Sequence, residues 1–208
     1  MRRTLAITIL SGLIFFTACN DPAADTSKAR TGEAAQVASP AAAQGQKYLI
    51  TPQNSKIEFI GSKVTGKHNG SFGEFSGHVD YTGNPETSHV NITIKTESIT
   101  TDTPDLTKHL KTADFFDVAK YPEATFVSTA IKPGGENGAS HTVTGNLTMH
   151  GVTKAITFPA TISVTPDAAT VESSFSINRK DFGINYAGAA DNLIRDDVVL
   201  TLHVRATK

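Results

Sequence analysis

Alternation of apolar and polar side chains with a period of two is the feature that most constrains this chain. It is clearest in residues 156–164 and 198–204, where every second residue is apolar. Successive side chains of a strand point to opposite faces of a sheet, so this period predicts strands with one buried face. Further runs occupy residues 56–60, 70–81, 89–95, 125–131, 142–149 and 171–177. The sequence therefore predicts an all-β domain.

Turn signals separate these runs, for example Gly83-Asn84-Pro85 and Pro133-Gly134-Gly135. Many short antiparallel strands at this spacing are typical of a sandwich or a barrel. Alternation alone does not choose between the two.

One segment, residues 103–121, departs from the strand pattern. Pro104 suits the first position of a helix. Leu106, His109 and Leu110 then fall on one helical face. We expect one or two short helices here, and such an insert could plug one end of a barrel.

The N-terminus resembles an export signal. Arg2 and Arg3 precede a short apolar run, and Ala18 and Cys19 follow it. The run is shorter than the roughly 20 residues that a membrane-spanning helix needs. We therefore expect a signal peptide over residues 1–18. Its end resembles a bacterial lipobox, in which the cysteine after the cleavage point carries a lipid anchor.

Cys19 is the only cysteine of the chain, so the mature protein has no disulfide and no cysteine-based metal site. The alternative is that Cys19 is not lipidated and stands in the apolar segment by chance. Asn20 follows Cys19; by resemblance to enteric lipoproteins, retention at the inner membrane would require Asp there. We therefore expect a periplasmic protein anchored by Cys19, with the outer membrane favoured.

The rest of the chain divides into two parts. Residues 19–46 are Ala-rich and polar with almost no large apolar side chains, which predicts a flexible tether. Residues 47–208 have the length of one domain. The formal net charge of −1 becomes about −3 without Arg2 and Arg3. A nucleic-acid partner would require a positive footprint, so we expect none.

No local motif indicates catalysis or metal binding. The chain has no G-x-S-x-G and no H-E-x-x-H. We expect no catalytic residues, no metal and no cofactor other than a bound lipid. A metal site assembled from His and Asp residues distant in sequence stays open as an alternative.

Four motifs follow one another along the chain. The first spans Gly61 to Gly77, and the second is Lys108-His109-Leu110-Lys111-Thr112-Ala113-Asp114-Phe115-Phe116-Asp117-Val118 with the following Lys120-Tyr121-Pro122. The others are Gly145-Asn146-Leu147-Thr148-Met149-His150-Gly151-Val152-Thr153-Lys154 and Arg179-Lys180-Asp181-Phe182-Gly183-Ile184. Together these motifs resemble those of the YceI-like family, over about residues 48–208. One departure is Leu106-Thr107, where many members carry Arg-Asp, so no role of that pair is carried over.

The resemblance implies an extended, antiparallel, lipocalin-like barrel of eight strands with a short helical insert at about residues 103–121. It also implies a periplasmic or secreted protein that holds a polyisoprenoid in its barrel, with an isoprenoid quinone as a further candidate ligand. A wide barrel leaves a lumen that its own side chains do not fill, so some of the phenylalanines of the chain should line a cavity. The cavity candidates are Phe59, Phe72, Phe75, Phe115, Phe116, Phe126, Phe158, Phe175 and Phe182. The alternative for each of them is ordinary core packing.

Polar candidates for contact with a ligand headgroup are fewer. Arg179 continues the apolar parity of Phe175 and Ile177, so it should point inward near a barrel end and could bind phosphate or carboxylate. Its alternative is a structural ion pair. His109 lies on the apolar face of the expected helix and is a second candidate, with a hydrogen-bonded core histidine as the alternative. Rim candidates in the first hairpin are Lys63, Lys67 and His68.

These observations predict a binding protein rather than an enzyme. One alternative is a stress-related or interaction protein whose barrel is filled by side chains. The other is an enzyme that acts on isoprenoid lipids, which requires titratable groups that converge at the cavity mouth. Oligomeric state does not follow from the sequence.

Overall fold

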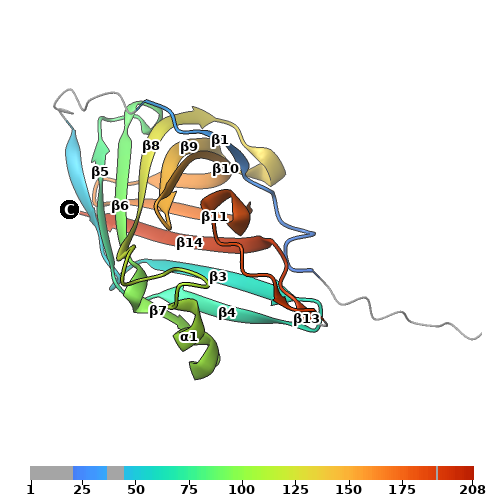
Figure 1. Cartoon of the computed structure of the whole chain (residues 1–208). Coiled ribbons are helices and arrows are strands. Elements are labelled where there is room, and N and C mark those ends of the chain that lie inside the picture. The colour runs from blue at the N-terminus through green and yellow to red at the C-terminus, as the bar shows by residue number, and fades with distance from the viewer. Residues whose placement is uncertain (1–20, 37–44, 191) are drawn as a thin grey trace, which may run out of the picture.

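The structure is a computed structural model of the chain, and it describes residues 21–36, 45–190 and 192–208 (Figure 1). The expected signal peptide over residues 1–18 and the expected lipidation site at Cys19 lie outside these residues, so both stay predictions.

Eight strands form a closed antiparallel ring (Figure 1). In order around the ring they are β2 (Gln46–Ile50), β5 (Phe75–Tyr81), β6 (His89–Lys95), β8 (Glu123–Pro133), β9 (His141–Met149), β10 (Val152–Val164), β11 (Ala168–Asn178) and β14 (Asp197–Thr207). The ring closes because β14 pairs along the whole of β11 and meets β2 at the pair Thr207↔Leu49. The predicted eight-stranded barrel is confirmed, and a sandwich is excluded.

Three more strands widen one end of the barrel. β3 (Lys56–Lys63) pairs with β14, β4 (Gly66–Phe72) pairs with β3, and β7 (Ile99–Thr101) pairs with β4. Figure 1 shows β3 and β4 below β14, on the side where α1 lies. We call this end the mouth.

The predicted short helical insert is confirmed as a single helix. Only α1 (Pro104–Leu110) is an α-helix, whereas residues 111–121 form successive turns. Asp117 adopts the left-handed region with φ 44°, which a helix interior does not allow. The described residues also form four 3₁₀ turns: η1 (Pro85–Thr87), η2 (Thr96–Ser98), η3 (Glu136–Gly138) and η4 (Arg179–Phe182). A small hairpin of β12 (Gly188–Ala189) and β13 (Asn192–Leu193) lies beside the mouth.

Residues 21–36, which we call the strap, are folded onto the barrel and are not a free tether. β1 (Arg30–Glu33) pairs with β10 at residues 154–157, and Lys28 forms a parallel bridge to Ser176 of β11. β10 and β11 pair with each other only at residues 161–164 and 169–172, so the strap fills the seam between them. The prediction of a flexible tether over 19–46 is therefore wrong for residues 21–36, while residues 37–44 lie outside the described part.

Low hydrophobicity did not prevent the strap from folding, because its backbone groups meet the unpaired edges of two strands. The Ala29 N–H donates to the Ser176 carbonyl, and the Ser176 N–H donates to the Ser27 carbonyl, each at 2.8 Å. Ala29 is the one strap residue in the apolar core, where a small side chain fits beside larger ones of β10 and β11. An exposed ion pair of Lys28 with Asp197, at 2.8 Å, adds a side-chain contact.

Candidate functional site

The barrel encloses one large apolar cavity of about 410 Å³. Each of the eight ring strands contributes lining side chains. They include Ile50, Val79, Ile92, Phe126, Leu147, Phe158, Phe175 and Leu202. The volume falls within the roughly 300–1,000 Å³ of sites that bind small ligands. An apolar lumen of this kind can hold hydrocarbon and offers no polar partner along its length.

Period-two alternation produces this lining directly. Val198, Leu200, Leu202 and Val204 of β14 share one parity, and all four line the cavity. The same holds for Val90, Ile92 and Ile94 of β6. The inner face that the sequence predicted for these strands is therefore the wall of the lumen.

Seven of the nine candidate phenylalanines line the cavity. They are Phe59, Phe72, Phe115, Phe116, Phe126, Phe158 and Phe175. Within this set, the rings of Phe158 and Phe175 stack with centroids 4.2 Å apart. Phe75 and Phe182 do not reach the cavity. Phe75 packs in the core cluster that contains Tyr48 and Val79, and Phe182 is fully buried in the cluster that contains Phe158 and Ala29.

Two glycines make room for aromatic rings of the wall. A Cβ on Gly70 would lie 2.1 Å from the Cζ of Phe59, and one on Gly145 would lie 2.3 Å from the Cζ of Phe126. Each glycine lies on a strand adjacent to its phenylalanine. The rings can lie flat against the sheet only because these positions have no side chain.

Three aromatic rings form a cluster at the mouth. His109 of α1, Phe115 and Tyr186 contact one another with centroid separations of 5.0–5.3 Å, and all three line the cavity. His109 Nε2 also lies 2.8 Å from an oxygen of Asp114. His109 thus reaches the cavity as predicted. Tyr186 was missed, because the segment around it has no periodic pattern.

A second histidine–aspartate pair lies on the same rim. His68 lines the cavity, and its Nδ1 lies 2.8 Å from Asp102 Oδ1. The Asn69 N–H donates to the other oxygen of Asp102. The hydrogen bond with His68, followed by that with Asn69, lowers the pKa of Asp102 below its usual 3.8. Of the two predicted rim lysines, Lys63 lines the cavity, whereas Lys67 is exposed beside it.

Arg179 is buried as predicted, with 4% of its surface exposed, and its guanidinium is engaged by the protein itself. The strand ends at Asn178, so Arg179 opens the η4 turn instead of continuing the strand. The guanidinium donates to the carbonyls of Ile184, Ile194 and Arg195 and to the Asp196 carboxylate. Burial lowers the pKa of Arg179, and the charge of Asp196 opposes that shift. The structure thus realises the alternative of a structural ion pair, and the side chain holds the loop 184–196.

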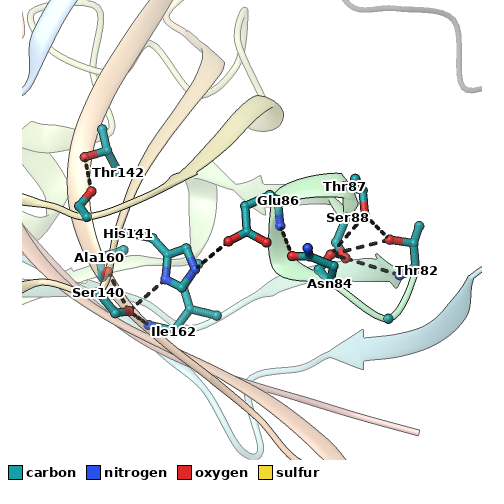
Figure 2. A network of polar contacts seen from close by, with 12 residues as sticks. Thr82, Asn84, Glu86, Thr87, Ser88, Ser140, His141, Thr142, Ala160 and Ile162 are labelled. Atoms are coloured by element: carbon teal, nitrogen blue, oxygen red, sulfur yellow. Dashed lines mark hydrogen bonds and ion pairs between the residues drawn. The ribbon is translucent and has the colours of Figure 1, made fainter.

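The opposite end of the barrel is tied together by polar contacts (Figure 2). His141 of β9 lies between Ser140, at 2.8 Å, and Glu86 of the β5–β6 connection, at 3.7 Å. The Ser140 hydroxyl also accepts the Ile162 N–H of β10. These contacts join two loops and a strand at the end of the barrel away from the mouth. The side chains of Glu86, Ser140 and His141 do not line the cavity.

Two further findings concern metal binding and membrane-spanning helices in the parts of the chain that the structure describes. Within residues 21–36, 45–190 and 192–208, no group of three or more His, Cys, Asp or Glu side chains is arranged to hold a metal ion. Over the same residues, no helix is both long enough and apolar enough to cross a membrane.

Comparison with known proteins agrees with this fold. The chain matches the YceI-like domain over residues 48–206. It is 40% identical over 136 residues to a UPF0312 protein of Pseudomonas putida strain GB-1, which covers 62% of this chain and 70% of that protein. A UPF0312 protein of Pseudomonas fluorescens strain SBW25 is 37% identical over 138 residues, covering 63% of this chain and 71% of the relative.

Solved structures share the barrel. BcnA of Burkholderia cenocepacia superposes with a TM-score of 0.67 at 26% identity, over 76% of this chain and 99% of that one. The YceI protein of Campylobacter jejuni gives 0.58 at 27% identity, over 67% and 84%. A polyisoprenoid binding domain from Saccharophagus degradans gives 0.61 at 17% identity, over 77% and 97%, a likeness of fold alone. By the match over residues 48–206 and these relatives, the chain belongs to the YceI-like family.

Proposed function

We propose that this protein binds a long apolar lipid, a polyisoprenoid or an isoprenoid quinone, inside its barrel and releases it unchanged. The observation that carries the proposal is the apolar cavity of about 410 Å³ with walls from all eight ring strands. A barrel filled by its own side chains would have no such space. The Saccharophagus domain with the same fold is described as binding polyisoprenoid, which supports the ligand class.

The apolar tail of the ligand cannot by itself account for selective binding of one lipid. Lipid tails in a bilayer are already in apolar surroundings, so moving one into the barrel gains little. Polar groups at the mouth are then needed to favour a given headgroup. Lys63, His68, His109 and Tyr186 line the cavity there and can donate hydrogen bonds to a phosphate or a quinone carbonyl. Arg179 lines the cavity too, but it is not assigned this role, because its guanidinium already bonds three loop carbonyls and the Asp196 carboxylate.

We also propose that the protein is held at the periplasmic side of a membrane by a lipid on Cys19. The basic N-terminus, the short apolar run and the single cysteine after Ala18 support this location. Asn20 favours the outer membrane. An anchored carrier stays close to the bilayer in which its ligand is dissolved.

One observation keeps an enzyme as a second candidate. The His109–Asp114 and His68–Asp102 pairs both lie on the cavity mouth, and a histidine oriented by a carboxylate is a common general base. The binding account expects a bound isoprenoid to be recovered unaltered after prolonged incubation with the protein. Formation of a product by wild type, abolished in His109→Ala or His68→Ala, would favour the enzyme.

A cavity-filling variant tests the binding proposal. Ala124 of β8 is buried and lines the cavity, so Ala124→Trp places an indole in the lumen. Thr161→Trp puts the same group on an exposed position of β10 as a control. Each folded variant is mixed with a long-chain polyprenol and examined by native mass spectrometry. We expect wild type and Thr161→Trp to take up one polyprenol and Ala124→Trp at least about tenfold less. Equal uptake by all three would place the ligand outside the barrel.

A further inference from the structure

Most of the large apolar side chains that are exposed in the described residues lie at the mouth. Four large apolar residues in the described part of the chain are strongly exposed: Leu49 at 50%, Val64 at 42%, Tyr186 at 37% and Leu193 at 50%. Val64 lies in the β3–β4 turn, Leu193 in β13, and Tyr186 in the aromatic cluster of the mouth. We call these three residues the rim patch. Leu49 lies at the opposite end, where it pairs with Thr207 near the C-terminus.

The three segments that carry the rim patch bond to one another. The Ile194 N–H, next to Leu193, donates at 3.1 Å to the carbonyl of Ala187, next to Tyr186. The Val64 N–H donates to the Leu193 carbonyl at 3.1 Å, and Thr65 bonds to Asn192 at 2.8 Å. Tyr186 packs on His109 and Phe115, which line the cavity. Two hairpin tips and the cavity entrance therefore face the same side. Isolated exposed apolar residues are ordinary, but a cluster around a cavity entrance marks a docking surface.

The N-terminal strap ends at the same rim. Asp21 is ion-paired with Arg195 at 3.0 Å, and Arg195 lines the cavity and donates its N–H to the Ser62 carbonyl. Figure 1 shows the blue segment that precedes β1 running from the seam toward the β13 end of the barrel. The strap is fixed on its way there by β1, by the bridge at Lys28 and by the buried Ala29. Its start is therefore positioned at the mouth.

Cys19 lies only two residues before Asp21. Two residues span at most about 7 Å even when fully extended. A lipid on Cys19 would therefore hold the mouth, and not the opposite end, against the membrane. The two observations are independent, since one concerns exposed side chains and the other the position of the chain terminus.

We propose that the mouth is the membrane-docking face of this protein and that its occupant is the phospholipid bilayer holding the lipid anchor of Cys19. The inference rests on the anchoring proposed above. The anchor supplies attachment, and the rim patch, too small to bind a membrane alone, sets the orientation. A ligand then passes between bilayer and cavity without entering water.

The rim carries side chains of both charge signs, so electrostatic attraction to anionic lipid should contribute little to docking. Lys63 and Lys67 flank Val64, but Asp102 and Asp114 lie on the same rim. With both signs present, docking should depend on insertion of apolar side chains and little on anionic lipid. The orientation should accordingly be the same in zwitterionic and anionic vesicles.

Single tryptophans test the orientation, because the chain contains none. The full-length chain carrying Val64→Trp, Leu193→Trp or Leu49→Trp is produced in a Gram-negative host. Each variant is purified from the membrane fraction in detergent and reconstituted into phosphatidylcholine vesicles with and without brominated acyl chains. Leu49→Trp is the matched control, since Leu49 and Leu193 are equally exposed at opposite ends of the barrel. Thermal unfolding checks that each variant is folded.

We expect brominated lipid to quench the tryptophans at positions 64 and 193 by at least about half and the one at 49 hardly at all. Equal quenching at all three positions, or stronger quenching at 49, would overturn the proposal. A chain that does not associate with membranes or vesicles would overturn it as well. The result is separable from ligand binding, which is measured independently as the isoprenoid content of the barrel.

Discussion

The guanidinium of Arg179 lies 3.2 Å from the carboxylate of Asp196, and the Arg179 N–H donates to the Asp196 carbonyl at 2.9 Å. These contacts join the end of β11 to the start of β14 across the loop that carries Tyr186. The same side chain binds carbonyls at both ends of that loop. The mouth of the cavity is thus shaped by a buried cation that itself lines the otherwise apolar cavity.

Removal of this cation should reduce stability. Arg179→Ala leaves carbonyl groups of the loop without a partner, and we expect it to lower the free energy of unfolding by about 2–4 kcal/mol. Lys180→Ala is the control, because Lys180 also contacts Asp196, at 2.9 Å, but is exposed, so its loss should cost no more than about 1 kcal/mol. Urea unfolding followed by circular dichroism measures both. Equal stability of the two variants would contradict the structural role of Arg179.

Release of the strap should open the seam between β10 and β11. Ala29→Asp places a carboxylate at a buried site, so the strap should detach while the barrel stays folded. Thr31→Asp, at an exposed position of β1, serves as the matched control. Hydrogen exchange of the Ser176 amide, which bonds to the Ser27 carbonyl, reports the contact. We expect exchange at least about tenfold faster in Ala29→Asp only; unchanged protection would show that the strap tolerates the charge.

Gly70 should control the position of the Phe59 ring. In Gly70→Ala the new Cβ would overlap this ring, which must then move away from the sheet and into the lumen. Gly66→Ala, on the same strand and with open space around its Cβ, is the control. We expect Gly70→Ala to bind polyprenol at least about threefold more weakly than Gly66→Ala in a titration. Identical affinities would mean that Phe59 does not limit the cavity.

The His68–Asp102 pair should give a measurable pH signature. The pKa of Asp102 is lowered from 3.8, mainly by its hydrogen bond with His68. A lowered pKa in the folded state stabilises the protein above about pH 3.8, and this contribution disappears as the pH falls through the lowered value. NMR titration of the Asp102 carboxyl carbon should give a midpoint below 3.8 that moves up toward it in His68→Ala. His203→Ala, on β14, should leave the midpoint unchanged; a shift there, or none in His68→Ala, would contradict the assignment.

The strands and most of the cavity wall follow from the sequence because alternation is a local property. Val198, Leu200 and Leu202 had to share a face wherever β14 was placed, and closure of the barrel turns that face into the lumen. Phe75 and Phe182 show the limit of the same reasoning. Their burial was predictable, but whether each reaches the open lumen depends on the side chains packed around it, such as Tyr48 and Val79 around Phe75.

The remaining features depend on contacts between residues far apart in the chain. The strap has the composition of a tether, and only the unpaired edges of β10 and β11 make it a strand. Tyr186 lies in a segment without periodicity, which reaches the mouth because Arg179 holds its ends. The start of α1 was predictable from Pro104, whereas its early end depends on turns around Asp117 that have no simple sequence signal.

The content of the barrel is the most direct test of the account. The full-length chain is produced in its own host, isolated from the membrane fraction, and examined by native mass spectrometry, followed by denaturing extraction and identification of the released lipid. We predict one isoprenoid lipid or quinone per chain in addition to any lipid attached to Cys19. If the isolated protein contains no lipid in its barrel and also takes up no added polyprenol or quinone, the proposal that the cavity is a lipid-binding site is contradicted.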